Sequence, residues 1–374
     1  MQIYLDNNAA TPVDPRVLAA FTAATAHPGN PQSSEHALGR SANARIETAA
    51  DAVAALIDAQ PNHVTFLPGA TAALTLLIDT YHHATQEATF CAGAADHSAV
   101  LKRLRDLAQE GAAFWLAPVD NKGHLRLDTF ETLVHAHTPR LVCLVAANNE
   151  VGTIDDLAPA CRIAQEAGAI VMVDACQAAG KIPLSFQSLR CDFLVLSGAK
   201  LYGLPRTAAV VSRYDLSEAA KSRFGSPDAP GAVSLGEACR LRAEEMNKDE
   251  ARIASLRDRL ENILCSAFPD MHVNGDPARR LAGILNFAVP GVPNDAVLAR
   301  VDGRIALSSG AACQSGAQGP SHVLRAMNAP DWVLDGALRV GVGKFNTATE
   351  IQEAGSILIA AIEEARTACY RRSA

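Results

Sequence analysis

The chain has 374 residues, of which 49% are hydrophobic and 5% aromatic, and its 33 basic and 40 acidic residues give a formal net charge of −7. This length and apolar content predict more than one hydrophobic core. The negative charge, without any basic run, argues against direct binding of nucleic acid.

Neither a membrane segment nor a metal site is predicted. The N-terminal residues lack the basic and apolar regions of a signal peptide, and no stretch is long and apolar enough to cross a bilayer. We therefore expect a cytoplasmic protein without a membrane partner. The nine cysteines show no CxxC or CxxH spacing, which predicts neither a zinc site nor a disulfide framework.

Segments with apolar residues at helical spacing alternate along the sequence with short apolar runs of strand length. Apolar residues recur at helical spacing over residues 43–58, 99–111, 157–168 and 236–268 and from Ala348 onward. Apolar runs of strand length lie at residues 63–67, 141–146, 170–173, 193–196 and 286–289. The alternation predicts an α/β fold with a doubly wound, mostly parallel sheet, in which ligands bind beyond the carboxyl ends of the strands.

The long helical pattern over residues 236–268 predicts a bridge between two domains. We expect a large domain over residues 12–245 and a smaller α+β domain made by residues 1–11 and 246–374. The Pro- and Gly-rich segment 227–231, just before the bridge, indicates an ordered turn.

Polar or small residues directly follow four of the predicted strands. They lie at residues 68–71, 148–150, 174–177 and 197–200. Because parallel strands end at the same edge of a sheet, we expect these four clusters to converge on one site.

Two of the clusters suit the two ends of a charged, aromatic cofactor. Gly69, Ala70 and Thr71 open a helical pattern, and a helix start favours a phosphate, although a plain loop has the same composition. Asp174 follows four apolar residues at a strand end, where an ionised carboxylate is costly without a cationic partner. A protonated pyridine nitrogen is such a partner, and the alternatives are a helix cap or a metal ligand.

Lys200 follows another buried strand within Ser-Gly-Ala-Lys. Desolvation and a nearby cation would make its amine nucleophilic enough for Schiff-base chemistry, whereas a solvated lysine is the ordinary alternative. Together with Asp174 and the phosphate cradle, Lys200 predicts a pyridoxal phosphate site. His97 opens a helix, where it either stacks on the cofactor and moves protons or only caps the helix.

Cys313 lies among small and polar residues in the segment 308–315. Small neighbours keep a thiolate accessible, and backbone N–H groups and hydroxyls can stabilise its charge, which suggests sulfur chemistry. The alternative is a small core residue.

In this order, the motifs resemble the NifS-like cysteine desulfurases, which are class V aminotransferases of the fold-type I pyridoxal phosphate enzymes. The resemblance runs nearly end to end, through residues 4–12, 30–36, 69–71, 148–152, 173–177, 197–200, 308–315, 320–326 and 339–344. It implies a seven-stranded type of sheet and a homodimer with shared sites.

The resemblance also implies how the cofactor is held. Lys200 would bind pyridoxal phosphate covalently, and Asp174 would pair with its pyridine nitrogen. Gln177 would contact the ring hydroxyl, and His97 would stack on the ring. The residues that would bind the phosphate are Ala70, Thr71, Ser197 and, reaching the phosphate held by the partner subunit, Ser226.

For the substrate, the resemblance implies free L-cysteine. Asn149 and Arg339 would receive its carboxylate, for which a guanidinium fork is suited. The Cys313 thiolate would attack the substrate sulfur, so that L-alanine leaves and Cys313 keeps a persulfide. The segment around Cys313 is long enough for delivery to a sulfur-acceptor protein.

The sequence departs from the family pattern at two places near the lysine. Ala199 replaces a histidine, which removes a phosphate contact. The stretch between Lys200 and Arg223 is shortened, and Ser226 replaces a threonine. These departures motivate one alternative, a catalytically weak partner protein. The alternative within the same family is a lyase for selenocysteine, cysteine sulfinate or cystine, in which Cys313 is dispensable.

Overall fold

Seven strands form the central sheet of the structure, a computed structural model that describes residues 2–83, 88–309 and 319–373. Across the sheet the order is β2 (Val64–Leu67), β8 (Ala208–Ser212), β7 (Phe193–Ser197), β6 (Ile170–Asp174), β5 (Leu141–Val145), β3 (Thr89–Gly93) and β4 (Ala113–Ala117). The five strands from β7 to β4 are mutually parallel, whereas β8 runs antiparallel to both β7 and β2.

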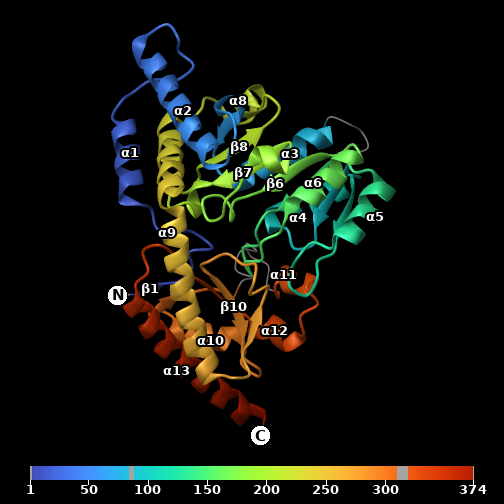
Figure 1. Ribbon diagram of the computed structural model, residues 1–374, viewed down its shortest axis with the longest axis vertical. Coiled ribbons are helices and arrows are strands. Elements are labelled where there is room, and N and C mark those ends of the chain that lie inside the picture. The colour runs from blue at the N-terminus through green and yellow to red at the C-terminus, as the bar shows by residue number, and fades with distance from the viewer. Residues whose placement is uncertain (1, 84–87, 310–318, 374) are drawn as a thin grey trace.

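Helices cover both faces of this sheet (Figure 1). Within β5, Leu141 and Cys143 pack into the core with α3 (Ala70–His83) and α4 (Ser98–Gln109). Their neighbours Val142 and Leu144 pack into the opposite core with α5 (Leu127–His137) and α6 (Leu157–Glu166). Since alternate residues of one strand are buried on opposite faces, the predicted doubly wound α/β fold is confirmed.

A 39-residue helix, α9 (Ala229–Ala267), runs along the molecule past the seven-stranded sheet to a second group of elements (Figure 1). Its upper part packs against α1 (Pro15–Thr25) and α2 (Ala37–Leu56). The helix begins where Asp228 accepts the backbone N–H of Gly231 at 3.1 Å. The segment 227–231, predicted as a turn, is thus the start of α9. Two short helices, α7 (Phe186–Leu189) and α8 (Ser217–Phe224), complete this half.

The second group is built on an antiparallel sheet of three strands. Its order is β12 (Leu338–Gly341), β10 (Ile284–Ala288) and β9 (His272–Asn274). Its helices are α10 (Asn294–Val301), α11 (His322–Ala326), α12 (Asp331–Gly336) and α13 (Ala348–Ser373). The N-terminal strand β1 (Ile3–Tyr4) pairs in parallel with β11 (Ile305–Ala306), so that both chain ends belong to this group. The division of the chain into two domains at residue 245 stays a prediction.

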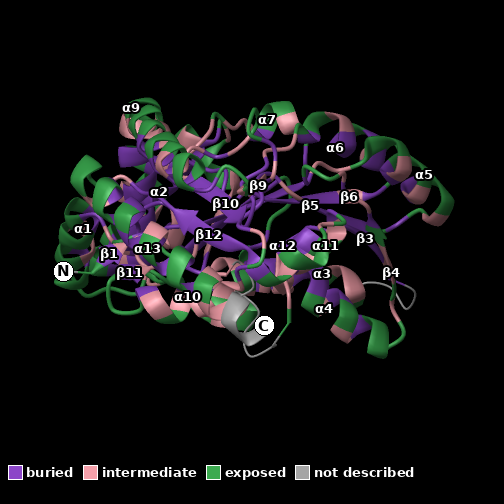
Figure 2. Cartoon of the chain, turned by 90° about the horizontal axis from the view of Figure 1, so that it is seen from below, coloured by how far each residue is buried: buried purple, intermediate pink, exposed green. Residues whose placement is uncertain are grey.

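Most strands lie inside the molecule, the edge strand β4 being partly exposed, and the helices present exposed outer faces (Figure 2). Among the described residues, the helices include none that combines the length and apolar character needed to cross a bilayer. The described part of the chain also contains no cluster of His, Cys, Asp and Glu that could hold a metal ion. In a doubly wound fold, a ligand site is expected at the carboxyl ends of the parallel strands.

Candidate active site

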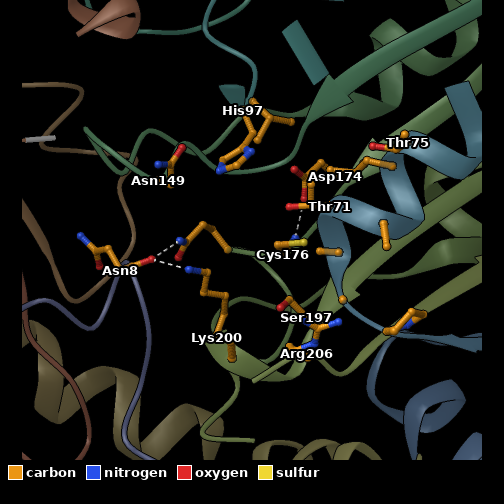
Figure 3. Close-up of a pocket in the computed structure, with 18 of the residues that line it drawn as sticks. Asn8, Thr71, Thr75, His97, Asn149, Asp174, Cys176, Ser197, Lys200 and Arg206 are labelled. Carbon is orange, nitrogen blue, oxygen red and sulfur yellow. Dashed lines mark hydrogen bonds between the residues drawn. The ribbon is translucent and has the colours of Figure 1, made fainter. Parts of the chain in front are cut away.

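A cavity of about 580 Å³ lies where the predicted clusters were expected to meet. It is lined by Val145 at the end of β5, Asp174 at the end of β6 and Ser197 at the end of β7. The first residues of α3 and His97, which precedes α4, close it from the loops after β2 and β3 (Figure 3).

Most of the predicted site residues share this cavity. Those that line it are Ala70, Thr71, His97, Asn149, Asp174, Gln177, Ser197 and Lys200. Arg339 is fully buried beside it, and Ser226 lies in a neighbouring hollow of about 340 Å³. Cys313 lies outside the described residues.

One end of the cavity suits a phosphate group. The helix α3 begins there at Ala70, where its first N–H groups have no partner within the helix. Gly69 precedes it with a φ of +115°, a conformation that favours glycine. Thr71 and Ser197 add hydroxyls. Arg206 and Arg223, which sequence reasoning missed, also line this end; Arg206 adds a positive charge, whereas Arg223 is paired with Asp79 at 3.1 Å.

In the same cavity, Asp174 is a buried carboxylate with 7% of its surface exposed. It accepts the backbone N–H of Cys176 at 3.0 Å, and the part of the chain that the structure describes holds no ion-pair partner for it. A buried carboxylate without a cation is costly. The site therefore fits a ligand that brings its own positive charge, such as a protonated ring nitrogen.

His97 caps a helix and also faces the cavity. Its Nδ1 accepts the backbone N–H of Ala99 at 3.2 Å and caps α4, while the ring also lines the cavity. Burial lowers the pKa of His97, and the positive charges of Lys200 and Arg339 act in the same direction against Asp174. In the neutral ring, the occupied Nδ1 assigns the proton to Nε2.

Lys200 lies in a short helical turn after β7 and points into the cavity (Figure 3). Its Nζ donates to the carbonyl oxygens of Asn8, at 2.9 Å, and Ala9. The Asn8 carbonyl also accepts from Nε2 of Gln177 at 2.8 Å. The N-terminal segment thus closes the lysine side of the site, a contact that the sequence signalled only through the motif over residues 4–12.

Arg339 lies next to Asn149 without lining the cavity. Its Nη1 donates to the backbone oxygen of Asn149 at 3.2 Å, and its Nη2 binds the carboxylate of Asp6 at 3.0 Å. This guanidinium therefore already holds a carboxylate group, the chemistry that substrate recognition needs.

The chain on both sides of the segment 310–318 is anchored near these residues. Ser308 exchanges backbone hydrogen bonds with Arg339 at 3.3 and 2.7 Å. On the other side, the hydroxyl of Ser321 donates to the carboxylate of Glu150, the residue after Asn149. A second cysteine, Cys176, lines the cavity itself. Burial raises the pKa of its thiol well above the usual range, which makes it a poor nucleophile.

Comparison with known proteins relates this geometry to a family. Residues 3–225 and 214–353 match the family described as aminotransferase class-V. The cysteine desulfurase of Homo sapiens is 33% identical over 363 residues, which cover 93% of this chain and 79% of that protein. The cysteine desulfurase IscS of Methylobacillus flagellatus is 34% identical and covers 93% and 89%.

A solved structure named NifS-like protein superposes with a TM-score of 0.88 at 28% identity, and the match covers 97% of this chain and 100% of that one. The class V family uses pyridoxal phosphate. Its charged ring nitrogen and phosphate suit the unpaired carboxylate and the helix start described above. From the cavity, the superposition and the match over nearly all of its length, we conclude that the chain belongs to the class V aminotransferase family, among the NifS-like cysteine desulfurases.

Proposed function

We propose that the chain is a cysteine desulfurase that removes sulfur from L-cysteine, releases L-alanine and retains the sulfur as a persulfide on Cys313. One observation carries the proposal: Lys200 and the unpaired carboxylate of Asp174 line the same cavity, beside the guanidinium of Arg339. The 33% to 34% identity to proteins named cysteine desulfurase supports the choice of substrate.

Each residue has a distinct function in this proposal. Bound pyridoxal phosphate supplies an electron sink for negative charge on the substrate Cα. Lys200 is the one lysine that lines the described cavity, so its Nζ is assigned to the cofactor's aldehyde carbon. Asp174 keeps the ring nitrogen protonated, and Thr71 and Ser197 orient the phosphate. His97 presents its Nε2 proton as a donor within the site.

For the substrate, Asn149 and Arg339 orient the carboxylate. The Sγ thiolate of Cys313 then attacks the substrate sulfur. A sulfur–sulfur bond forms while the carbon–sulfur bond breaks, and its electron pair stays with the carbon that becomes the methyl group of alanine. The protein thiol and L-cysteine thus give a protein persulfide and L-alanine, without an external oxidant.

We further propose a homodimer and transfer of the sulfur to an acceptor protein. Thr71 and Arg206 are exposed at the phosphate end of the cavity. The hollow that contains Ser226 shares Arg206, Pro68 and Phe224 with that end. A partner subunit placed over this opening would bring a second Ser226 hydroxyl toward the phosphate. Light scattering of the purified protein gives the mass of the assembly.

The deciding experiment measures alanine and sulfide release from L-cysteine by the protein loaded with pyridoxal phosphate, in the presence of reductant. The Cys313→Ala variant should lose turnover and keep the visible band of the bound cofactor. Cys176→Ala is the matched control, and it should keep both because the raised pKa of its thiol disfavours the nucleophilic thiolate.

Other outcomes contradict the proposal in different ways. Alanine release that survives in Cys313→Ala would indicate a lyase. Wild-type protein that binds no pyridoxal phosphate would instead indicate a catalytically weak partner protein.

A further inference from the structure

We propose that Lys181 is a positioning residue that fixes the side-chain amide of Gln177, so that its NH2 group faces the ring hydroxyl of bound pyridoxal phosphate. Nζ of Lys181 donates to Oε1 of Gln177 at 2.6 Å. The inference rests on the proposed contact between Gln177 and the cofactor, and it adds a residue that does not line the cavity.

The orientation follows from the donors and acceptors involved. An ammonium group has three donors and no acceptor, so the amide atom that faces Lys181 must be the oxygen. Nε2 of Gln177 then lies on the opposite side, where one hydrogen binds the carbonyl of Asn8 at 2.8 Å. The second hydrogen remains for the cavity, which Gln177 lines. A flipped amide would present its oxygen to the ring oxygen, and the two acceptors would repel each other.

The backbone brings the two side chains together. After Asp174 the chain makes consecutive hydrogen-bonded turns, in which Ala179 N–H donates to Ala175 O at 2.8 Å and Ile182 N–H donates to Ala178 O at 3.1 Å. Gln177 and Lys181 both lie in these turns, and their side chains meet in the 2.6 Å hydrogen bond.

Charged residues of α9 lie near Lys181, and their charges balance. Arg242, with 1% of its side chain exposed, binds Asp249 at 2.6 Å and Glu250 at 2.8 Å. The charge of Glu250 also stabilises the ammonium of Lys181. Two cations and two half-buried carboxylates thus form one charge-balanced group around the buried Arg242.

The backbone of Gly180 is part of the same arrangement. Arg242 donates from Nε to the Gly180 carbonyl at 2.8 Å. Gly180 has a φ of +65°, and a Cβ atom there would lie 3.0 Å from Cβ of Arg242. The turn that presents Lys181 therefore packs directly against α9. Burial lowers the pKa of Lys181 to about 8, so the ammonium form persists at neutral pH.

The test compares Lys181→Met, Gln177→Ala and the double variant by two properties of the bound cofactor: its dissociation constant and the pH midpoint of its visible band. Lys181→Met should weaken binding of pyridoxal phosphate about five- to tenfold, as for one lost hydrogen bond. The midpoint should rise by about 0.5 to 1 pH unit, because a donor and a nearby cation both favour the anionic ring oxygen. Lys181→Arg should restore most of both values.

The double variant separates positioning from general destabilisation. If Lys181 acts through Gln177, the double variant should be no worse than Gln177→Ala alone, whereas additive losses would overturn the proposal. Asp249→Asn is the matched control, since it removes an ion pair of Arg242 without touching Lys181 or Gln177, and both cofactor properties should stay near wild type. If Lys181→Met does not fold, the charge-neutral double variant Lys181→Met/Glu250→Gln replaces it. The same two cofactor properties then show whether the loss of Lys181 acts through Gln177.

The failures can be told apart. An unchanged band and affinity in Lys181→Met, with clear losses in Gln177→Ala, would overturn this proposal alone. Unchanged values in Gln177→Ala would also overturn the assigned contact of Gln177. Wild-type protein without a visible band would contradict the proposed function itself.

Discussion

The imidazole of His97 uses its two nitrogen atoms for different purposes. Nδ1 caps α4, and Nε2 carries the proton that faces the site. Asparagine at this position can still cap the helix, because its side-chain oxygen accepts backbone N–H groups, but it offers no ring to a cofactor. We expect His97→Asn to keep the thermal stability of wild type while kcat/KM for L-cysteine falls about 100-fold or more.

His97→Ala loses the cap as well as the ring. Its thermal unfolding should show an additional loss of about 1 kcal/mol. An Asn variant with wild-type kcat/KM would mean that the ring takes no part in the reaction and serves only as a cap.

Arg206 is the cation that we expect to compensate for Ala199, the position of the family's histidine. Its backbone is left-handed, with a φ of 61°, and a Cβ atom on Gly69 would lie 3.8 Å from its Cα. Within the described ranges its side chain has no hydrogen-bond or ion-pair partner. It is thus free to bind a phosphate at the start of α3. Arg206→Ala should weaken binding of pyridoxal phosphate about tenfold, as expected for one charge-assisted contact.

Pyridoxal, which lacks the phosphate, is the internal control for this variant. Its dissociation constant should not change in Arg206→Ala, and Arg206→Lys should retain most of the affinity for pyridoxal phosphate. An equal loss for both compounds would show that Arg206 supports the cavity without contacting phosphate.

At the scale of elements, the parallel strands β5, β6 and β7 could be predicted because they are buried on both faces and appear as continuous apolar runs. Because parallel strands end at the same edge of a sheet, Asp174 and Ser197 could then be placed in one site. The strands β3, β4 and β8 were not predicted, and an apolar run does not encode the antiparallel direction of β8. The start of α9 was missed for another reason: Pro and Gly suit a first helical turn as well as a loop.

The contacts that the sequence did not predict join residues far apart in the chain. Asn8 accepts hydrogen bonds from Gln177 and Lys200, more than 160 positions away, and neither periodicity nor composition encodes such a pairing. Arg339 was expected at the site from the resemblance, but its bond to Asp6 depends on how β12 and the N-terminal segment pack.

The loop after β5 contacts the start of α11 through a buried carboxyl group whose ionisation is costly. Glu150 is 2% exposed and accepts from the hydroxyl of Ser321. Burial raises the pKa of Glu150 from 4.5 to about 7, and the hydrogen bond from Ser321 offsets only part of the shift. Between these pH values the folded chain binds a proton that the unfolded chain has released. This contribution to stability is complete below pH 4.5 and is lost as the pH rises through about 7.

Glu150→Gln should therefore be more stable than wild type at pH 8, by about 1 to 3 kcal/mol, because the amide stays neutral. The difference should close toward pH 5, where Glu150 is protonated. Thermal unfolding of both proteins at pH 5, 6.5 and 8 measures it. A difference that is constant across this range would show that Glu150 does not titrate in the folded chain.

At the scale of the whole molecule, the site depends on how the two groups of elements are held together. The segment after β5 supplies Asn149, and it also pairs with the chain before β10: Leu281 N–H donates to Gly152 O and Ile154 N–H to Arg279 O, both at 2.9 Å. Gly152 has a φ of +80°, and a Cβ atom there would lie 3.0 Å from Cβ of Ile284. The spacing between Asn149 and Arg339 is thus set by this contact between the two groups.

His124 joins the same two groups through its two ring nitrogens. Nδ1 lies 2.9 Å from Asp155, near the end of that segment, and Nε2 lies 3.0 Å from Asp276, which follows β9. Burial lowers the pKa of His124, but the hydrogen bonds to Asp276 and Asp155 outweigh it and raise the pKa above 6.5. The stabilisation is therefore complete below pH 6.5 and is lost as the pH rises through the folded-state pKa.

His124→Gln should consequently be less stable than wild type at pH 6, by about 1 to 2 kcal/mol, and the difference should shrink by pH 9. Because Asn149 and Arg339 come from opposite sides of this connection, KM for L-cysteine should also rise in the variant. The cofactor should bind as in wild type, since the residues assigned to it follow strands of the seven-stranded sheet. If affinity for pyridoxal phosphate fell as much as affinity for L-cysteine, the connection through His124 would support the whole cavity, and the substrate site would not depend on it separately.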